Sequence, residues 1–549
     1  MNLFRSARVR VAWGALLLCA AASTVSAAAA PNAPTIGQSP RYINPLNLPA
    51  NSNDGSARGV SLGDPTVVRD GDRYYLFATG VTNGPSPLGG AWVSKDLVHW
   101  EWKPLAEGSE RLTIAPDVAK FNGKYYMTGN GAPLYTADNI LGPYTEVGSW
   151  LDPQGRAVPD IPTTNGLPRR VFDVQMYVDK DNKPYVFMAY GQTGGVWAAP
   201  LDPNQPNRMT STPKDLIKSN LENVWERAGN ANERSNYSYM EGSWVFERNG
   251  TYYLQYSAGG TEWQTYATGY YTAKNALGPY TAVQDTPFLR QVTGVNTGPG
   301  HGSAVKGPDG NWWQFYLTVL NNPPGGRRIG MDPIGFDDRG RMFVRGGAPS
   351  ETPQWAPGVV ADPARNGDSS SIPLTFSKMR GMTVSSQQPA RPAAHAIDNY
   401  NGTWWAPAAE DRQPTLTLDL MGIPPFDPLF LIDSTRIQFQ GLNFSFRQPP
   451  RPGQAPVGPV GPEPPGPRPE DAPFSGATAF QYRMEASEDG KAWRTVVDKT
   501  ASTVTRYTEF DDFSPVRARF VRLTLTDWPR SASQPLGIVE FTVFGKLAE

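Results

Sequence analysis

The chain has 549 residues with 50 Lys+Arg against 51 Asp+Glu, so its net charge is −1 and it has no basic excess for nucleic acid or an acidic membrane. The 55 Gly and 54 Pro make up about one residue in five, against an average nearer one in eight, which argues against a long helical bundle. Aromatic residues are frequent (23 Phe, 16 Trp, 23 Tyr) and only 18% of residues are charged, which favours an all-β protein with Gly and Pro turns.

The first thirty residues are typical of a secretory signal peptide. Arg5, Arg8 and Arg10 precede an apolar run over residues 11–22, and small Ala-rich positions follow. A membrane anchor is the alternative, but the run is shorter than the eighteen or so residues needed to span a bilayer. We therefore expect residues 1–30 to be removed and the protein to be secreted or periplasmic.

Cysteine and histidine are scarce. Cys19 lies within the predicted signal peptide, so the mature chain has no thiol for a disulfide, a nucleophile or a zinc site. The three histidines, His99, His301 and His395, are too few for a histidine-rich metal centre.

A hairpin pattern recurs five times, roughly every 60 residues. Each copy has a polar or glycine turn followed by aromatic residues in a strand. The copies are DGDRYYLFATG, FNGKYYMTGN, DKDNKPYVFMAYG, RNGTYYLQYSAG and PDGNWWQFYL. The spacing leaves room for two more strands per copy, which is typical of a propeller blade.

The repeat predicts an all-β fold with a five-bladed β-propeller over residues 40–350. The sequence LGPY occurs at 141–144 and again at 277–280, and we expect these segments to form equivalent outer turns. An array of β-sandwiches is the alternative, but its hairpins would return about every 20 residues.

One polar residue precedes each aromatic hairpin, at the expected start of an innermost strand. These residues are Asp64, Asp117, Asp173, Glu241 and His301. Because innermost strands run along the central channel, their first residues converge at one mouth of it. Carboxylates crowded there repel one another, which raises some pKa values and suits general acid and base catalysis.

The ordered series GDPTVVRDGDRYYLFATG, SKDLVHWE, APDVAKFNGKYYM, MEGSWVFERNGTYYLQYS, LGPY and GHGSAVKGPDGNWWQFYL resembles glycoside hydrolase family 43 over most of residues 40–345. The resemblance implies Asp64 as general base, Glu241 as general acid and Asp173 as the residue that tunes the pKa of the acid. It also implies hydrolysis with inversion. In Phe172-Asp173-Val174, Val174 stands where the family commonly has Pro, and Gly-Ser rather than Gly-Pro follows Glu241.

The residues themselves support these roles. Asp64 precedes Pro65, which has no N–H and favours a strand start without a ladder partner. Glu241 is followed by Trp244 and Phe246, and an acid against an apolar wall has a raised pKa, as a proton donor needs. Each acid alone could be an ordinary turn or strand-end residue, and Asp117 falls at a position that is mainly structural in the family.

The other candidate residues concern the sugar and a metal ion. Arg327 or Arg328 could reach a sugar hydroxyl or carboxylate, or form a rim salt bridge, and three aromatic residues, Trp92, Trp263 and Tyr266, could stack on a sugar ring or belong to the core. The resemblance implies that His301 contacts a water or a calcium ion. We expect no required cofactor, and any structural Ca²⁺ would be held mostly through water because a lone histidine suits it poorly. The alternative for His301 is a hydrogen-bonded core residue.

The chain changes character after residue 350. Residues 351–373 are predicted to be a linker. Residues 374–549, with TLTLDLMG and ARFVRLTLTDW, resemble a discoidin-type (coagulation factor 5/8 type C) β-sandwich like that of many carbohydrate-binding modules, with a proline-rich insertion at 448–473. Trp404, Trp405 and Arg412 are candidates for sugar binding there.

The sequence therefore predicts an exported, inverting, exo-acting glycosidase for α-L-arabinofuranosides or β-D-xylosides of polysaccharide side chains. A β-D-galactofuranosidase or galactosidase of the same fold is an alternative, and so is a non-catalytic carbohydrate-binding protein. Retaining fructosyl transfer is disfavoured because Phe172-Asp173-Val174 lacks the Arg-Asp-Pro of those propellers. We expect an oligosaccharide or polysaccharide partner, and no nucleic acid or membrane partner after signal removal.

Overall fold

A computed structural model describes residues 40–49, 62–80, 89–110, 112, 114–158, 171–189, 191–192, 194–283, 286–321, 324–359, 370–375, 381–420, 429–440, 475–530 and 536–548. The predicted signal peptide (1–30), the proline-rich insertion (448–473) and part of the linker lie outside the described residues, so these assignments and export stay predictions. No helix in the described part of the chain is long and apolar enough to cross a membrane.

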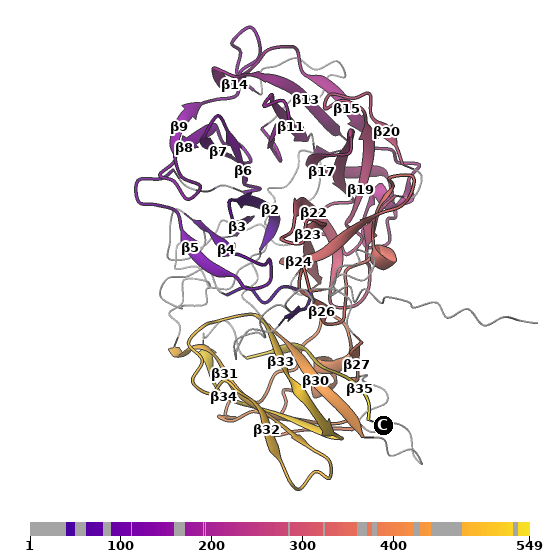
Figure 1. Cartoon of the computed structure of the whole chain (residues 1–549). Coiled ribbons are helices and arrows are strands. Elements are labelled where there is room, and N and C mark those ends of the chain that lie inside the picture. The colour runs from indigo at the N-terminus through magenta and orange to yellow at the C-terminus, as the bar shows by residue number, and fades with distance from the viewer. Residues whose placement is uncertain are drawn as a thin grey trace, which may run out of the picture. The chain divides into compact units, whose positions relative to one another are not determined.

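Five antiparallel sheets follow one another along the described residues between 63 and 344, as the repeat predicts (Figure 1). The first contains β2 (Gly63–Asp70), β3 (Arg73–Thr79), β4 (Gly90–Ser94) and β5 (Glu101–Pro104). The second contains β6 (Asp117–Phe121), β7 (Lys124–Thr128), β8 (Leu134–Ala137) and β9 (Thr145–Gly148). The third contains β10 (Gln175–Val178), β11 (Pro184–Ala189), β13 (Gly195–Asp202), β14 (Gln205–Met209) and β15 (Lys214–Lys218).

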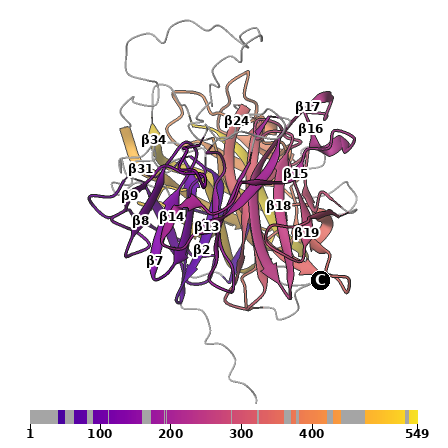
Figure 2. The same ribbon diagram turned by 90° about the horizontal axis from the view of Figure 1, so that it is seen from above.

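The fourth sheet is the largest of the five. It contains β12 (Gly191–Gln192), β16 (Arg227–Ala228), β17 (Arg234–Arg248), β18 (Thr251–Ala258), β19 (Ala267–Ala273), β20 (Thr281–Ala282) and β21 (Leu289–Arg290). The fifth contains β22 (Thr297–Lys306), β23 (Trp312–Asn321), β24 (Pro324–Phe336) and β25 (Met342–Val344). Figure 2 shows β18 and β19 running side by side in the perpendicular view.

The five sheets form a closed ring around their inner strands. The inner strands β2, β6, β10, β17 and β22 each contact the inner strand of the next sheet, and β22 contacts β2. Each sheet is thus one blade, and the described residues form a five-bladed propeller. Asp64, Asp173 and His301 meet on the inner side of this ring, as the sequence predicts, but Glu241 and His301 lie within β17 and β22 rather than at their first residues.

The paired aromatics of the repeat explain how neighbouring blades pack. Tyr125 belongs to the hydrophobic core shared with the first blade, whereas Tyr126 belongs to the core shared with the third. Tyr252 and Tyr253 divide in the same way between two successive cores. Adjacent residues of a strand point to opposite faces of its sheet, so one aromatic pair supplies apolar surface to both neighbours of a blade.

A segment ahead of the first blade fastens the ring. The Asn44 side chain donates to the Met331 carbonyl at 3.0 Å and accepts from the Met331 N–H at 2.9 Å. β1 (Arg41–Tyr42) pairs with β26 (Gln354–Trp355), so the strands that enter and leave the propeller meet. Between the first and last blades, the Val67 N–H donates to Ser303 Oγ at 3.0 Å.

The two LGPY segments form equivalent outer turns, as predicted. Both contain a cis Gly–Pro bond. The Tyr144 hydroxyl donates to the Ile140 carbonyl at 2.8 Å, and the Tyr280 hydroxyl donates to the Ala276 carbonyl at 2.9 Å. An outermost strand follows each turn directly, β9 in one blade and β20 in the other.

The described residues after 370 form two sheets packed as a β-sandwich. One contains β27 (Ile372–Pro373), β35 (Ile538–Leu547), β30 (Phe430–Phe439) and β33 (Thr508–Ala518). The other contains β28 (Gly381–Val384), β29 (Thr415–Asp419), β34 (Phe520–Arg530), β31 (Ser475–Ser487) and β32 (Arg494–Asp498). Their inner faces share one apolar core, which includes Trp405, Leu523 and Phe541. Short 3₁₀ segments occur at Val224–Glu226, Arg345–Gly347 and Ala393–Ile397.

Candidate active site

The acids predicted at the strand starts lie where the backbone departs from regular strand geometry. The pairing register of β2 shifts between Gly63 and Thr66, and Asp64 has a φ of 52°. The register of β17 shifts between Glu241 and Trp244, where Gly242 has a φ of 63°. Such bulges redirect side chains at the cost of local strain, and they cluster at functional sites.

Asp173 and His301 also lie where the backbone departs from regular strand geometry. Asp173 lies two residues before β10 with a φ of 45°. His301 has a φ of 30° and lies within a register shift of β22, between Gly300 and Ser303. Positive φ is uncommon for residues other than glycine, so its recurrence at three of these positions marks a shared geometry that directs their side chains toward one another.

Asp64 is buried and accepts hydrogen bonds from two side chains. Arg327 Nη1 lies 2.9 Å from Asp64 Oδ1 and 3.0 Å from Oδ2, and the Thr79 hydroxyl donates to Oδ2. Burial pushes the pKa of Asp64 upward, but Arg327, His301 and Thr79 together outweigh it and hold that pKa below its usual value. The contacts of Asp64 therefore favour its ionised form although the side chain is buried.

His301 connects two of the acids. Its Nδ1 lies 3.2 Å from Asp64 Oδ1 and 3.5 Å from Asp173 Oδ2, and its backbone N–H donates to Ser257 Oγ at 2.7 Å. Asp173 Oδ2 also accepts the Gly242 N–H at 2.8 Å. Burial and the nearby charge of Asp64 raise the pKa of Asp173, although His301 opposes the shift.

The pKa of Glu241 shifts in the opposite direction to the pKa of Asp64. It is buried, and its Oε1 accepts the Tyr266 hydroxyl at 2.8 Å. Burial, followed by the charge of Asp173, raises the pKa of Glu241 well above its usual value, and the Tyr266 hydrogen bond only moderates the rise. One buried cluster thus holds a carboxylate that stays ionised and a carboxyl that stays protonated, the pair needed for a base and an acid at the same pH.

The other predicted sugar contacts divide between the cluster and the core. Arg327 and Tyr266 lie in the cluster, where each contacts an acid rather than open space. Trp92 is completely buried and its indole N–H donates to the Pro49 carbonyl at 2.8 Å, which places it in the core. Trp263 is half-buried, with the Arg234 guanidinium 4.8 Å from its ring centroid.

Arg328 is directed away from the acids. Its Nη1 donates to the Arg327 carbonyl at 2.9 Å, and its guanidinium lies 5.6 Å from the centroid of the Tyr507 ring in the sandwich. Burial lowers the pKa of Arg328 to about 10.

Asp117 has the same position in its blade but a structural contact. Its Oδ2 accepts the Met176 N–H at 2.8 Å, which joins the second blade to the third. Burial raises the pKa of Asp117 to about 7. The structural interpretation of this residue is therefore the one the contacts favour.

Sequence reasoning missed three polar residues that support the acids. Thr79 binds Asp64, Asn130 Oδ1 accepts the Asp173 N–H, and Ser257 Oγ accepts the His301 N–H. All three lie at or just after the end of the second strand of a blade, in FATG, MTGN and YSAG. A small polar residue within two positions of a Gly, at the end of three of the aromatic hairpins, is the signal that could have identified them.

The surroundings of His301 bear on the calcium ion that the resemblance implies. Its Nδ1 faces two carboxylates, and no group of three or more metal-ligating side chains occurs among the described residues. A calcium ion held through water stays a prediction.

The candidate residues of the sandwich lie on one loop region. Trp405 is completely buried and its indole N–H donates to the Ser386 carbonyl at 3.1 Å. Trp404 is half-buried, with the Arg391 guanidinium 3.4 Å from its ring centroid, and Arg412 is exposed. Trp405 therefore belongs to the core, and a binding role for Trp404 or Arg412 stays a prediction.

Two family models match parts of the chain. A model of glycosyl hydrolases family 43 matches residues 59–342, more than half of the chain, and a model of the F5/8 type C domain matches residues 468–539. The chain is 26% identical over 305 residues to a β-D-galactofuranosidase of Aspergillus niger, covering 51% of this chain and 81% of that protein. It is also 26% identical over 298 residues to an α-L-arabinofuranosidase of Humicola insolens, covering 50% of this chain and 57% of that protein.

A crystal structure of a thermostable family-43 glycoside hydrolase is 25% identical, with a TM-score of 0.46, and covers 58% of this chain and 100% of that one. The chain spans about half the length of several curated relatives that it matches, among them a xylosidase/arabinosidase of Butyrivibrio fibrisolvens. From the family match and the buried acids on or beside the inner strands of a five-bladed propeller, the chain belongs to glycosyl hydrolases family 43 and carries an F5/8 type C domain after its propeller.

Proposed function

We propose that the protein is an exported glycosidase that hydrolyses α-L-arabinofuranosides or β-D-xylosides with inversion, acting on the ends of polysaccharide side chains. The observation that carries the proposal is the opposite tuning of Asp64 and Glu241 within one buried cluster. A binding site has no need of one carboxyl kept ionised and another kept protonated.

In the proposed reaction Asp64 accepts a proton from a water molecule, whose oxygen attacks the anomeric carbon from the face opposite the leaving group. Glu241 donates its proton to the glycosidic oxygen as the bond to the anomeric carbon breaks. The released sugar carries the water oxygen, the leaving group carries the proton from Glu241, and Asp64 holds the proton taken from the water. Asp173 keeps the pKa of Glu241 raised, and Arg327 keeps Asp64 ionised.

The identity of the sugar has two candidate classes, a pentose and β-D-galactofuranose. Relatives named as xylosidase, arabinosidase or α-L-arabinofuranosidase support a pentose. β-D-Galactofuranose is the second candidate, since the match to the Aspergillus niger β-D-galactofuranosidase spans 81% of that protein. β-D-Galactofuranose has one more exocyclic carbon than α-L-arabinofuranose on a ring of the same configuration, whereas the β-D-xyloside has a different ring, and side chains around the cluster would distinguish them.

The test measures release of 4-nitrophenol by the full mature chain from α-L-arabinofuranoside, β-D-xyloside, β-D-galactofuranoside and β-D-galactoside. Asp64→Asn should abolish turnover. Glu241→Gln should reduce it less on these substrates than on an oligosaccharide, because nitrophenolate leaves with little protonation. Asp117→Asn is the matched control: it changes a buried aspartate at the same strand position and should retain activity.

Proton NMR of the first product formed should show the anomer inverted relative to the substrate. A retained anomer would overturn the inverting mechanism. Absence of turnover on every aryl glycoside and on arabino- and xylo-oligosaccharides, with sugar binding still measured by calorimetry, would instead support a non-catalytic carbohydrate-binding protein.

A further inference from the structure

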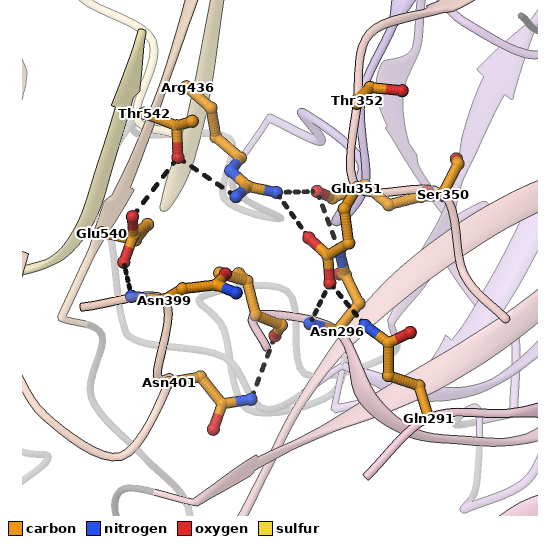
Figure 3. A network of polar contacts seen from close by, with 12 residues as sticks. Gln291, Asn296, Ser350, Glu351, Thr352, Asn399, Asn401, Arg436, Glu540 and Thr542 are labelled. Carbon is orange, nitrogen blue, oxygen red and sulfur yellow. Dashed lines mark hydrogen bonds and ion pairs between the residues drawn. The ribbon is translucent and has the colours of Figure 1, made fainter. Parts of the chain in front are cut away.

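Polar contacts join the sandwich to the propeller, within the compact unit formed by residues 40–549. Arg436 in β30 has Nη1 3.1 Å from Glu351 Oε2 and 2.9 Å from the Asn44 carbonyl, and its Nη2 donates to Thr542 Oγ1 at 3.1 Å (Figure 3). Glu351 Oε1 in turn accepts the Asn296 N–H at 3.0 Å. These contacts hold the sandwich on the segment that leads into β22.

A second contact from the sandwich reaches the hairpin of the last blade. Asn401 is 1% exposed, and its Nδ2 lies 3.0 Å from the Val295 carbonyl, 3.2 Å from Thr297 Oγ1 and 3.1 Å from the Val319 carbonyl. Val319 in β23 pairs with Thr297 in β22 on one side and with Arg327 in β24 on the other. One amide from the sandwich therefore bridges two strands directly beside Arg327.

A third contact joins Arg328, the residue next to Arg327, to the sandwich. The Arg328 guanidinium faces the Tyr507 ring, which packs edge-on against Phe480 with centroids 5.8 Å apart. Phe480 stacks on Phe439, so the ring that meets Arg328 is fixed by the sandwich core. Adjacent residues of β24 thus face different partners: Arg327 faces Asp64 and Arg328 faces the sandwich.

We propose that the sandwich is part of the catalytic apparatus of the propeller: Asn401 and Tyr507 are positioning residues that hold β23 and β24 so that Arg327 keeps its ion pair with Asp64. This inference rests on the proposed function, because it assigns Asp64 as the base. The ion pair depends on close fit, since the side chain of Arg327 lies against Gly63 with no room for a Cβ. A small shift of β24 would therefore separate the guanidinium from Asp64.

The variants test positioning against mere attachment of the two domains. Asn401→Ala and Tyr507→Leu should both raise the pKa of Asp64, because burial then acts with less opposition from Arg327. The acidic limb of the kcat/KM profile should move upward by about one pH unit, which is about tenfold lower kcat/KM at pH values below the limb. Tyr507→Phe keeps the ring and should keep the wild-type limb.

Glu351→Gln is the matched control. It weakens the Arg436 contact between the domains but touches neither β23 nor β24. It should lower Tm to a similar extent as Asn401→Ala and leave the acidic limb in place. If Asn401→Ala and Tyr507→Leu lower Tm in the same way without moving the limb, the sandwich is only attached, and the proposal is wrong.

A second measurement works without turnover. The chain has three histidines, so ¹³C-histidine labelling gives few ring signals, and His301→Gln assigns the one beside Asp64. In a pH titration, the His301 signal should report Asp64 protonation at higher pH in Asn401→Ala than in wild type or Glu351→Gln. An unchanged inflection would overturn the positioning role, whereas inactivity of the wild-type protein would overturn only the proposed function.

Discussion

Asp64 and Glu241 are both buried, yet their pKa values move in opposite directions because their neighbours differ. Asp64 has a guanidinium and a hydroxyl as hydrogen-bond donors, and these favour its charged form. Glu241 has one hydroxyl donor and a nearby acid, Asp173, which disfavours its charge. Activity should thus have a plateau between an acidic limb set by Asp64 and an alkaline limb set by Glu241.

Thr79→Val removes one of the donors to Asp64. We expect the pKa of Asp64 to rise and the acidic limb of kcat/KM to move to higher pH by about one to two units, since a hydrogen bond to a charged group contributes about 1.5–3 kcal/mol and one pKa unit corresponds to about 1.4 kcal/mol. Thr79→Ser keeps the hydroxyl and should behave like wild type. A limb unchanged in Thr79→Val would mean that this hydroxyl does not tune the base.

Tyr266→Phe should change the alkaline limb of the kcat/KM pH profile. The Tyr266 hydroxyl favours ionised Glu241, so its loss should raise the pKa of Glu241 further and move the alkaline limb to higher pH, with the acidic limb unmoved. We expect kcat to fall about tenfold because Glu241 also loses the contact that orients it. The pH profile of kcat/KM measures this, and a shift of the acidic limb instead would contradict the assignment of Glu241 as the acid.

Two glycines near the acids have no room for a Cβ, because a large side chain lies against each of them. A Cβ added to Gly63 would lie 2.4 Å from Arg327 Cζ, and one added to Gly300 would lie 2.1 Å from Tyr266 Cε1. Both glycines let a large side chain cross the backbone at the point where it meets an acid. The strand starts are therefore packed around the acids as well as bent to present them.

Gly63→Ala should displace Arg327 from Asp64 and lower kcat/KM by about a hundredfold, as expected when a charge-assisted contact in the site is misplaced. Calorimetry of the same variant separates this effect from unfolding: the protein should still unfold in one transition above the assay temperature. Wild-type kcat/KM in Gly63→Ala would show that Arg327 relocates without consequence.

The elements of the fold were largely predictable, and the support of the site was not. The repeat of turn and aromatic strand predicted five blades, because five copies occur roughly every 60 residues with room for two more strands in each. The position of the acids in these copies predicted their convergence. The role of Thr79 and the burial of Trp92 depend on contacts between residues far apart in the chain, which no local pattern encodes. Asp117 had the register of the acids but lacked the positive φ that Asp64 and Asp173 share.

At the scale of the whole molecule, the contact between sandwich and propeller contains a buried acid. Glu540 accepts the Asn399 N–H at 3.0 Å, and burial raises its pKa to about 8 even though Arg436 opposes the shift, with Asp398 and Glu351 adding negative charge nearby. A carboxyl that is more basic in the folded than in the unfolded chain binds more protons when folded. Its contribution to stability is therefore lost as the pH rises from the unfolded pKa near 4.5 to about 8.

Glu540→Gln removes that titration and keeps an oxygen for the Asn399 N–H. Wild type and variant should have similar stability near pH 5, and the variant should be more stable near pH 8 by up to a few kcal/mol, at about 1.4 kcal/mol per pKa unit. Thermal unfolding between pH 5 and 8.5 measures the difference. Parallel curves for the two proteins would mean that Glu540 titrates normally in the folded state.

The aromatic pairs also bear on how such a ring could change in size. In the second and fourth blades, the aromatic pair gives one ring to the core shared with the blade before and one to the core shared with the blade after, so these blades carry apolar joints on both sides. If a blade of this kind were duplicated or deleted, the blades on either side would still meet matching apolar surfaces. The number of blades is therefore set by the closure of the ring, where β22 contacts β2 and where Asn44 binds Met331 in the last blade.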